Sequence, residues 1–185
     1  MYQKYLVRER RRDQERSDED ILTFSRKFDL HQYFSPASRN TQRFIHYDSL
    51  KGISMVHDAD QMSGDPDTLV VAVNGACPDN GIQPATKSSI GVFFGPDSPF
   101  NLSEKIARPE GVLHTTNYAE LMAVHNVLCL IKNSSFLSEW RTREEEKVLT
   151  AIIMTDSTNV YNSLTAWIWK WRENNFADSN GHPVS

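Results

Sequence analysis

The chain has 185 residues, of which 39% are hydrophobic, so it is long enough to bury the core of one ordinary domain and to carry an extension. It contains no run of 18 or more apolar residues, and its amino terminus is charged where a secretory signal would be apolar. These features argue against a secreted or membrane-spanning protein and predict an intracellular one, in which Cys77 and Cys129 are reduced thiols. The formal net charge of −4 argues against a protein that holds a polyanion by charge alone.

We expect residues 1–66 to form a charged, partly disordered extension rather than a second domain. Residues 8–16 are a dense run of charges with few apolar side chains, which is typical of a solvated helix or of disorder. A basic arm is the alternative, but acidic residues are interspersed with the basic ones. We expect one amphipathic helix near residues 21–28 and an aromatic patch at residues 43–48 that packs onto the domain. Residues 63–67 contain glycine and proline and predict a linker.

The domain, residues 67–185, is expected to begin with a buried strand that runs into a polar turn. Residues 69–73 are all apolar and are β-branched or small, as a central strand covered on both faces requires. Gly75 and the pair Asn80-Gly81 then end the strand and turn the backbone. We therefore expect the side chain of Asn74 at the carboxyl end of this strand, where open α/β sheets place their functional residues.

Two more strands and a helix follow in the sequence. Residues 90–94 predict a second strand and residues 101–106 a third, and short connections favour antiparallel pairing. Residues 117–132 predict the clearest helix, whose start has the capping spacing Asn117-x-x-Glu120. Its expected apolar face consists of Leu121, Val124, Leu128 and Ile131.

A fourth strand, residues 148–154, is expected to lie parallel to the first. A helix separates the two strands in sequence, so a right-handed crossover connects them. Asn74 and Asp156 then come to the same end of neighbouring strands, with Glu120 on the helix beside them. Taken singly, Glu120 is more simply a capping-box glutamate, and Asp156 is more simply the cap of a helix that begins near Ser157.

Three stretches occur in a fixed order along the domain. They are the strand end Asn74-Gly-Ala-Cys, the helix start Thr115-Thr-Asn-Tyr-Ala-Glu120, and Thr155-Asp-Ser followed by Trp167 and Trp171. In these motifs the chain resembles the type 1 ribonuclease H family. The resemblance implies an α/β fold: a ribonuclease H-like mixed sheet of three antiparallel strands and then a parallel strand, with flanking helices. Because the chain stops at Ser185, the fold is expected to be incomplete at its carboxyl-terminal end, which leaves residues 148–154 as an unprotected sheet edge.

The resemblance implies an endoribonuclease, a hydrolase that cuts the RNA strand of an RNA/DNA hybrid with two Mg²⁺ or Mn²⁺ ions. It implies that Glu120 and Asp156 are catalytic metal ligands, because hard cations prefer oxygen. Asn74 stands where the family has an aspartate between the two metals, and an amide offers one neutral oxygen in place of a bridging carboxylate. The family's last carboxylate lies beyond Ser185. We therefore expect strongly impaired metal binding and cleavage, and only partial recovery from Asn74→Asp alone.

The resemblance also implies contacts with nucleic acid. Cys77, Asn80 and Asn117 match positions that in the family touch the minor groove of the hybrid, where the 2′-hydroxyls of RNA are read. Trp167 matches a position that abuts the backbone of the DNA strand. The simpler explanations are turn chemistry for the asparagines and core packing for a tryptophan that lies four residues from Trp171.

Two classes of function remain open after the sequence is read. The first is the family's own activity, a working ribonuclease H. The second is a catalytically inactive module that binds nucleic acid or regulates, or the product of a gene fragment. Asn74 and the early end of the sequence favour the second class. The sequence leaves the oligomeric state open.

Overall fold

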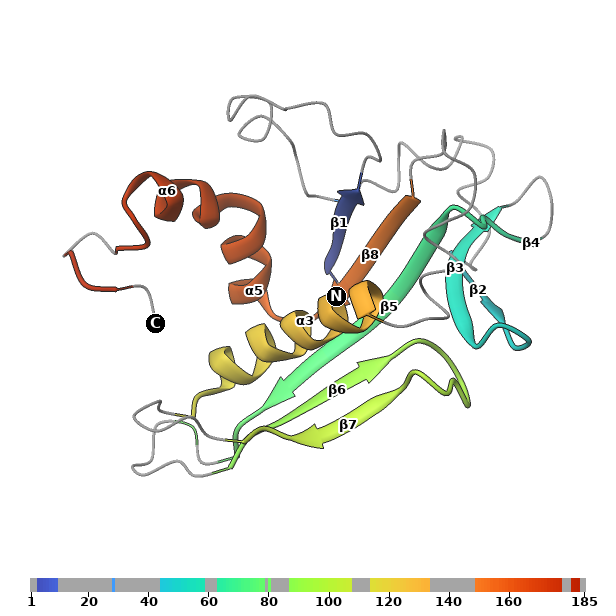
Figure 1. Ribbon diagram of the computed structural model, residues 1–185, viewed down its shortest axis with the longest axis horizontal. Helices are drawn as coiled ribbons and strands as arrows, with labels where there is room; N and C mark the ends of the chain where they lie inside the picture. The colour runs from blue at the N-terminus through green and yellow to red at the C-terminus, as the bar shows by residue number, and fades with distance from the viewer. Residues whose placement is uncertain are drawn as a thin grey trace.

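The computed structural model of the chain describes residues 3–9, 28, 44–58, 63–78, 80, 87–107, 114–133, 149–177 and 181–183. A mixed sheet of eight strands forms its centre, and one long helix lies along a face of this sheet (Figure 1). None of the helices in the described part of the chain is long and apolar enough to cross a membrane.

The strands follow one another along the chain with the helices inserted late in the sequence. The strands are β1 (Gln3–Glu9), β2 (Ile45–Asp48), β3 (Ile53–Asp58), β4 (Ser63–Gly64), β5 (Thr68–Ala76), β6 (Ser89–Phe93), β7 (Leu102–Lys105) and β8 (Leu149–Thr155). The helices are α3 (Thr116–Asn133), α5 (Thr158–Asn162), the π-helix η2 (Ser163–Trp167) and α6 (Ile168–Glu173). The main path of the sheet is β1-β8-β5-β3-β2, while β6 pairs with β5 and β7, and β4 pairs with β3.

The strands predicted for the domain are confirmed, and so is their topology, although β5 runs through Gly75 to Ala76 instead of ending at Gly75. β5 and β6 are antiparallel with Asn74 opposite Gly91, and β6 and β7 are also antiparallel. β5 and β8 are parallel with Ala72 opposite Met154. The fold class is therefore the predicted one, an α/β mixed sheet of three antiparallel strands and then a parallel strand.

Helix α3 approaches β5 closely because Gly75 has no side chain. A Cβ atom at Gly75 would lie 2.2 Å from the carbonyl carbon of Ala119 and 2.2 Å from the amide nitrogen of Glu120, both backbone atoms. Such a distance is far inside van der Waals contact. Glycine at this position thus allows the backbone of the helix to rest directly on the strand, and it brings Glu120 next to Asn74-Gly75.

The predicted buried face of α3 is confirmed in part, because Val124 and Ile131 are buried and Leu121 packs against the core. The buried residues of α3 are Ala119, Ala123, Val124, Val127 and Ile131, whereas Leu128, predicted to be in the core, is 39% exposed. At 3.6 residues per turn, Leu128 points away from the side of the helix on which Ala119 and Ala123 meet the strand. The face of the helix that meets the sheet is therefore rotated toward the alanines.

The predicted unprotected edge at β8 is a wrong prediction. β1 pairs antiparallel with β8 along its whole length, from Gln3 opposite Thr155 to Glu9 opposite Leu149. The extension thus supplies the strand that satisfies the backbone groups of this edge. Arg8 and Glu9, at the start of the predicted charge run, belong to β1, and residues 10–16 lie outside the described residues.

The rest of the extension that the structure describes also joins the sheet. The aromatic patch at residues 43–48 was expected to pack onto the domain, and most of it forms β2, which pairs with β3; β3 pairs with β5 through Ser54 and Val70. The predicted linker, residues 63–67, is instead an ordered turn that contains β4, and Thr68 Oγ1 donates a hydrogen bond to the Asp65 carbonyl at 2.8 Å. The sheet therefore does not divide at residue 66.

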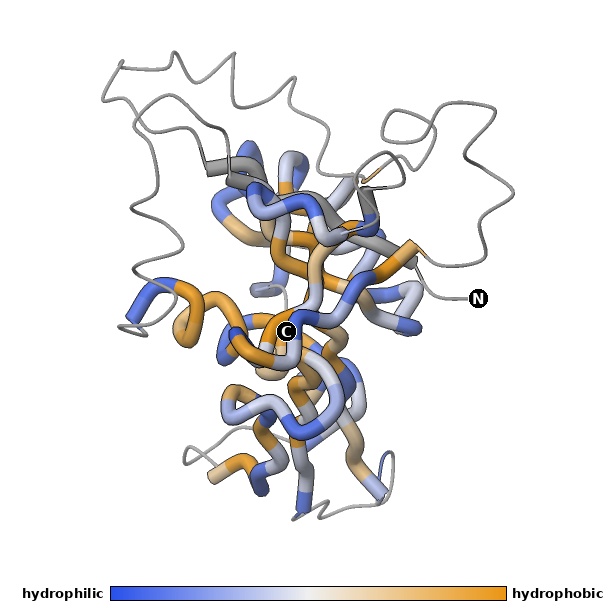
Figure 2. The backbone as a smooth tube through the Cα atoms, turned by 90° about the vertical axis from the view of Figure 1, so that its right-hand side faces the viewer, coloured by the Kyte–Doolittle hydropathy of each residue, from blue (hydrophilic) through white to orange (hydrophobic). Residues whose placement is uncertain are grey.

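Two clusters of buried residues lie on opposite faces of the sheet. The larger one packs beneath α3 and includes Leu69, Val71, Val73 and Phe94. The smaller one consists of Phe28, Val56, Val70 and Ile152, and Phe28 is the one described residue of the predicted helix at 21–28. Figure 2 shows hydrophobic stretches of the chain running through the middle of the molecule.

Candidate functional site

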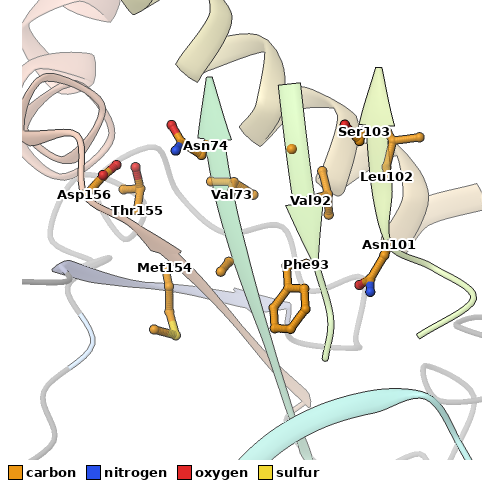
Figure 3. A pocket seen from close by; sticks show the side chains of 12 residues that line it. Val73, Asn74, Val92, Phe93, Asn101, Leu102, Ser103, Met154, Thr155 and Asp156 are labelled. Atoms are coloured by element: carbon orange, nitrogen blue, oxygen red, sulfur yellow. The ribbon is translucent and has the colours of Figure 1, made fainter. Parts of the chain in front are cut away.

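An open pocket of about 480 Å³ lies at the carboxyl end of β5, on the face of the sheet opposite α3. Side chains alternate along a strand, and Gly75 faces the helix, so Asn74 faces this pocket. Figure 3 shows Asn74, Thr155 and Asp156 grouped at one end of the pocket, with Met154 and Phe93 farther along it. The lining residues are Ala72, Val73, Asn74, Gly91, Val92, Phe93, Asn101, Leu102, Ser103, Met154, Thr155 and Asp156.

Asn74 and Asp156 are brought together as predicted. Both line the pocket, and both are exposed. Asn74 is the seventh residue of β5, and Asp156 directly follows β8, which runs parallel to β5. The parallel pairing of these two strands is therefore what places an amide and a carboxylate side by side.

Asp156 is not the helix cap that the simpler explanation required. Ser157 is the N-cap of α5, because its Oγ accepts a hydrogen bond from the Val160 amide at 3.2 Å. The Ser157 amide in turn donates to Thr155 Oγ1 at 3.1 Å. The carboxylate of Asp156 is thus not used as the cap of α5.

Glu120 is not a capping-box residue either. Helix α3 begins at Thr116, and the Tyr118 amide donates to Thr115 Oγ1 at 3.1 Å, so Thr115 and not Asn117 caps the helix. The carboxylate of Glu120 instead accepts a hydrogen bond at Oε2 from Ser157 Oγ at 2.5 Å. Glu120 is therefore held one residue from Asp156, on the α3 side of the strand ends, although it does not line the pocket itself.

The side chains at these three positions offer oxygen atoms, which are the ligands that hard cations prefer. Asp156 offers a full carboxylate, Asn74 offers one amide oxygen, and Glu120 shares Oε2 with Ser157. Within the described ranges, no group of three His, Cys, Asp or Glu side chains is placed to hold a metal ion. A site that binds two divalent cations requires bridging oxygens, which an asparagine cannot supply in the way a carboxylate does.

The predicted contacts with nucleic acid lie around the start of α3 and on the helices after β8. Asn80 and Asn117 are exposed, and Asn80 Oδ1 accepts a hydrogen bond from the Thr116 amide at 3.1 Å. Cys77 is buried at 6% exposure, so a contact at this position has to use its backbone. Trp167 is 39% exposed, and its ring centroid lies 5.9 Å from that of Trp171. These four residues keep their roles as predictions.

Ser157 is the residue of the site that sequence reasoning missed. It joins the start of α5 to the carboxylate on α3, since its hydroxyl accepts from Val160 and donates to Glu120. The signal for it was present, because a serine shortly after a strand end and three residues before the apolar Val160 is typical of an N-cap. Its second partner could not be read from the sequence, because Glu120 is 37 residues away.

Comparison with known proteins relates this chain to one family. A family model described as RNase H matches residues 66–185. A ribonuclease H of Schizosaccharomyces pombe is 36% identical over 118 residues, which are 64% of this chain and 37% of the relative. Ribonuclease H1 of Homo sapiens is 26% identical over 118 residues, which are 64% of this chain and 35% of the relative. The chain thus spans little more than a third of the length of these curated relatives.

Among solved structures, the chain is similar to a foamy viral protease-reverse transcriptase in complex with dsDNA. The similarity covers 64% of each chain at 20% sequence identity, with a TM-score of 0.40. A score of this size is too low to support a structural argument.

Proposed function

The chain belongs to the ribonuclease H family, and from this premise we propose that it binds RNA/DNA hybrids through the strand ends around Asn74 and cleaves their RNA strand poorly. The observation that carries the proposal is the position of Asn74. It lines the same pocket as Asp156, and its neighbour Gly75 rests on the backbone of Glu120. An amide therefore lies beside the Asp156 carboxylate, at the position where the resemblance implies that the family uses a carboxylate.

The family generally uses divalent metals, and such cations, when bound, activate a water and stabilise the leaving oxygen in phosphodiester hydrolysis. In this chain Glu120 and Asp156 would hold a cation, and Ser157 would keep the Glu120 carboxylate turned toward the strand ends. The amide of Asn74 adds no negative charge between them, so the group carries two formal charges in place of three. Lower charge and one fewer oxygen ligand weaken the hold on a hard cation.

The test is incubation of the pure chain with a labelled RNA/DNA hybrid and Mg²⁺. We expect retained binding of the hybrid with little cleavage. Robust cleavage that disappears in Glu120→Gln would contradict the proposed impairment, because it would show a working site built on the same residues. Absence of any binding to the hybrid at low salt would contradict the proposed substrate.

The change Asn74→Asp is expected to raise Mg²⁺ or Mn²⁺ affinity by roughly 10-fold or more, since even partners outside the ligand shell alter metal affinity 10 to 100-fold. Calorimetric titration with either cation measures it. The matched control is Ser103→Asp, which adds the same charge to the same pocket away from Asp156. An equal gain in both variants would show that general charge, and not the position of residue 74, controls the binding of the cation.

An inactive binding module is the second candidate, and the start of α3 favours it. Asn80 and Asn117 are exposed there, and Asn80 helps to fix the helix start through the Thr116 amide. Groove contacts of this kind do not depend on a metal. If Asn74→Asp gains metal affinity without any gain in cleavage, the binding module is the better description.

A further inference from the structure

Two ligands suited to a softer metal lie on the outer side of α3, away from the strand ends. His125 and Cys129 are four residues apart on the helix, and the distance from Cys129 Sγ to His125 Nε2 is 3.6 Å. His125 is exposed and Cys129 is partly exposed. The sheet-facing side of the same helix turns is formed by Val124 and Val127, which are buried. The thiol and the imidazole therefore converge at the solvent-facing surface of the helix.

The distance between the two atoms matches the spacing that one zinc ion imposes on its ligands. Zinc binds sulfur at about 2.3 Å and imidazole nitrogen at about 2.0 to 2.1 Å, and tetrahedral geometry then sets the separation of sulfur and nitrogen at about 3.6 Å. Residues at positions i and i+4 of a helix share one face, so the helix brings the two side chains within reach of one ion. We propose that His125 and Cys129 form a binding site for a divalent cation of the zinc class.

The site is completed by a second copy of the chain. A closed tetrahedral zinc site needs four ligands, and α3 supplies two. In the part of the chain that the structure describes, no third His, Cys, Asp or Glu joins the pair. A two-fold axis through the metal would supply the same imidazole and thiolate from a second α3, giving a set of two sulfurs and two nitrogens.

Leu128 supports an interface at this place. It lies between the two ligands in sequence and is 39% exposed, so it shares their solvent-facing surface of the helix. In a two-fold arrangement of α3 about the metal, Leu128 of each copy lies beside the site and contributes apolar contact. The site differs from the proposed hybrid site in position, because His125 is five residues beyond Glu120. It also differs in chemistry, because its ligands are nitrogen and sulfur instead of oxygen.

Titration of the full, reduced chain with Co²⁺, as a spectroscopic substitute for Zn²⁺, tests the proposal. We expect a thiolate-to-cobalt charge-transfer band and tetrahedral ligand-field bands that saturate at about half an equivalent of metal per chain. The thiol proton is released to the solvent on binding, so uptake strengthens as the pH rises. Analytical ultracentrifugation should show a dimer with Zn²⁺ and a monomer after a chelator is added.

The variants Cys129→Ser and His125→Gln are each expected to weaken metal affinity by roughly 100-fold or more, above the 10 to 100-fold effect of partners outside the ligand shell. The matched controls are Cys77→Ser, which changes a buried cysteine, and His46→Gln, which changes a histidine of β2; both should bind Co²⁺ normally. If Cys77→Ser fails to fold, His46→Gln remains as the control.

Three results overturn the proposal. They are a charge-transfer band that persists in Cys129→Ser, saturation at one metal per monomeric chain, and no uptake at all, which would leave the 3.6 Å contact as a hydrogen bond between thiol and imidazole. None of these measurements depends on nuclease activity. The proposed metal site is therefore tested independently of the proposed action on hybrids.

Discussion

Beneath α3, the sheet buries Leu69, Val71 and Val73 to 4% exposure or less, whereas on its opposite face Phe93 is 51% exposed and Asn74 is also exposed. The two faces come from the same strands, because neighbouring residues point in opposite directions. The face beneath α3 fixes where the strand ends lie. The opposite face also buries a cluster, around Val70 and Ile152, but it is open at the end that carries Asn74 and Phe93. The candidate site therefore depends on packing on the other side of the sheet.

The largest effect is expected from shortening two neighbouring side chains, one at the end of β6 and one directly after it. Phe94→Ala should lower the free energy of unfolding by about 4 kcal/mol, because Phe94 is fully buried and its loss leaves a cavity. Phe93→Ala, one residue earlier on the open face, should cost less than about 1 kcal/mol by the area it buries. Urea denaturation of both variants measures the difference. Equal losses would show that the open face is covered in solution.

A second pair of changes tests the close approach of the helix. Gly75→Ala should lower the free energy of unfolding by about 3 kcal/mol, because the added Cβ meets backbone atoms of Ala119 and Glu120 at 2.2 Å. The control is Gly91→Ala, where the nearest atom, the Asn74 carbonyl oxygen, is 4.0 Å from the added Cβ. Thermal denaturation of the two variants compares them directly. A mild effect of Gly75→Ala would mean that α3 sits farther from β5.

Ser157 connects helix α3 to the start of α5, next to the end of β8. Ser157→Ala removes the N-cap of α5 and the hydrogen bond to Glu120, and it should lower the free energy of unfolding by about 1 to 2 kcal/mol. Ser157→Asp keeps a capping oxygen for the Val160 amide but repels Glu120. The two losses separate the contribution of the cap from that of the link to Glu120. If both variants are as stable as the wild type, neither contact matters for folding.

The smallest effect is expected at the β2–β3 turn, away from both faces. The hydrogen bond from Lys51 holds the pKa of Asp48 below its ordinary value, and the Lys51 ammonium lies 2.8 Å from its carboxylate. The resulting stabilisation is fully present above the ordinary pKa of an aspartate and is lost as the pH falls through the lowered pKa. Asp48→Asn should therefore cost about 0.5 kcal/mol at neutral pH and nothing in strong acid. Unfolding of the wild type and of Asp48→Asn across this pH range measures the difference in stability. A difference that did not change with pH would contradict the assigned interaction of Asp48 with Lys51.

Much of the fold could be predicted because its signals are local. The apolar run before Asn74 and the helix at 117–132 are visible in composition and spacing, and the crossover rule then gives the parallel strand. The pairing of β1 with β8 could not be predicted, because it joins distant parts of the chain and β1 carries charges that do not mark a strand. The rotated face of α3 was hidden for another reason, since alanines give little hydrophobic signal.

The candidate site was predictable in its positions more than in its contacts. Motif order located Asn74, Glu120 and Asp156, and the structure places the three at adjoining strand and helix positions. The sequence could not show that Asn74 and Asp156 face the pocket while Glu120 is tied to Ser157 on the other side. Which side each residue faces depends on the alternation of side chains along β5 and on how closely α3 approaches that strand, and packing sets both.

The pairing of β1 with β8 also determines the order in which the molecule can be completed during synthesis. Gln3 pairs with Thr155, so β1 leaves the ribosome long before the strand with which it pairs. Contacts between residues so far apart in sequence form slowly, because a long loop must close before they contribute. Until that moment β8 presents free backbone groups to other nascent chains. Between the synthesis of β8 and the docking of β1, this edge can therefore pair with other chains, and chaperones that bind exposed strand edges would act on it then.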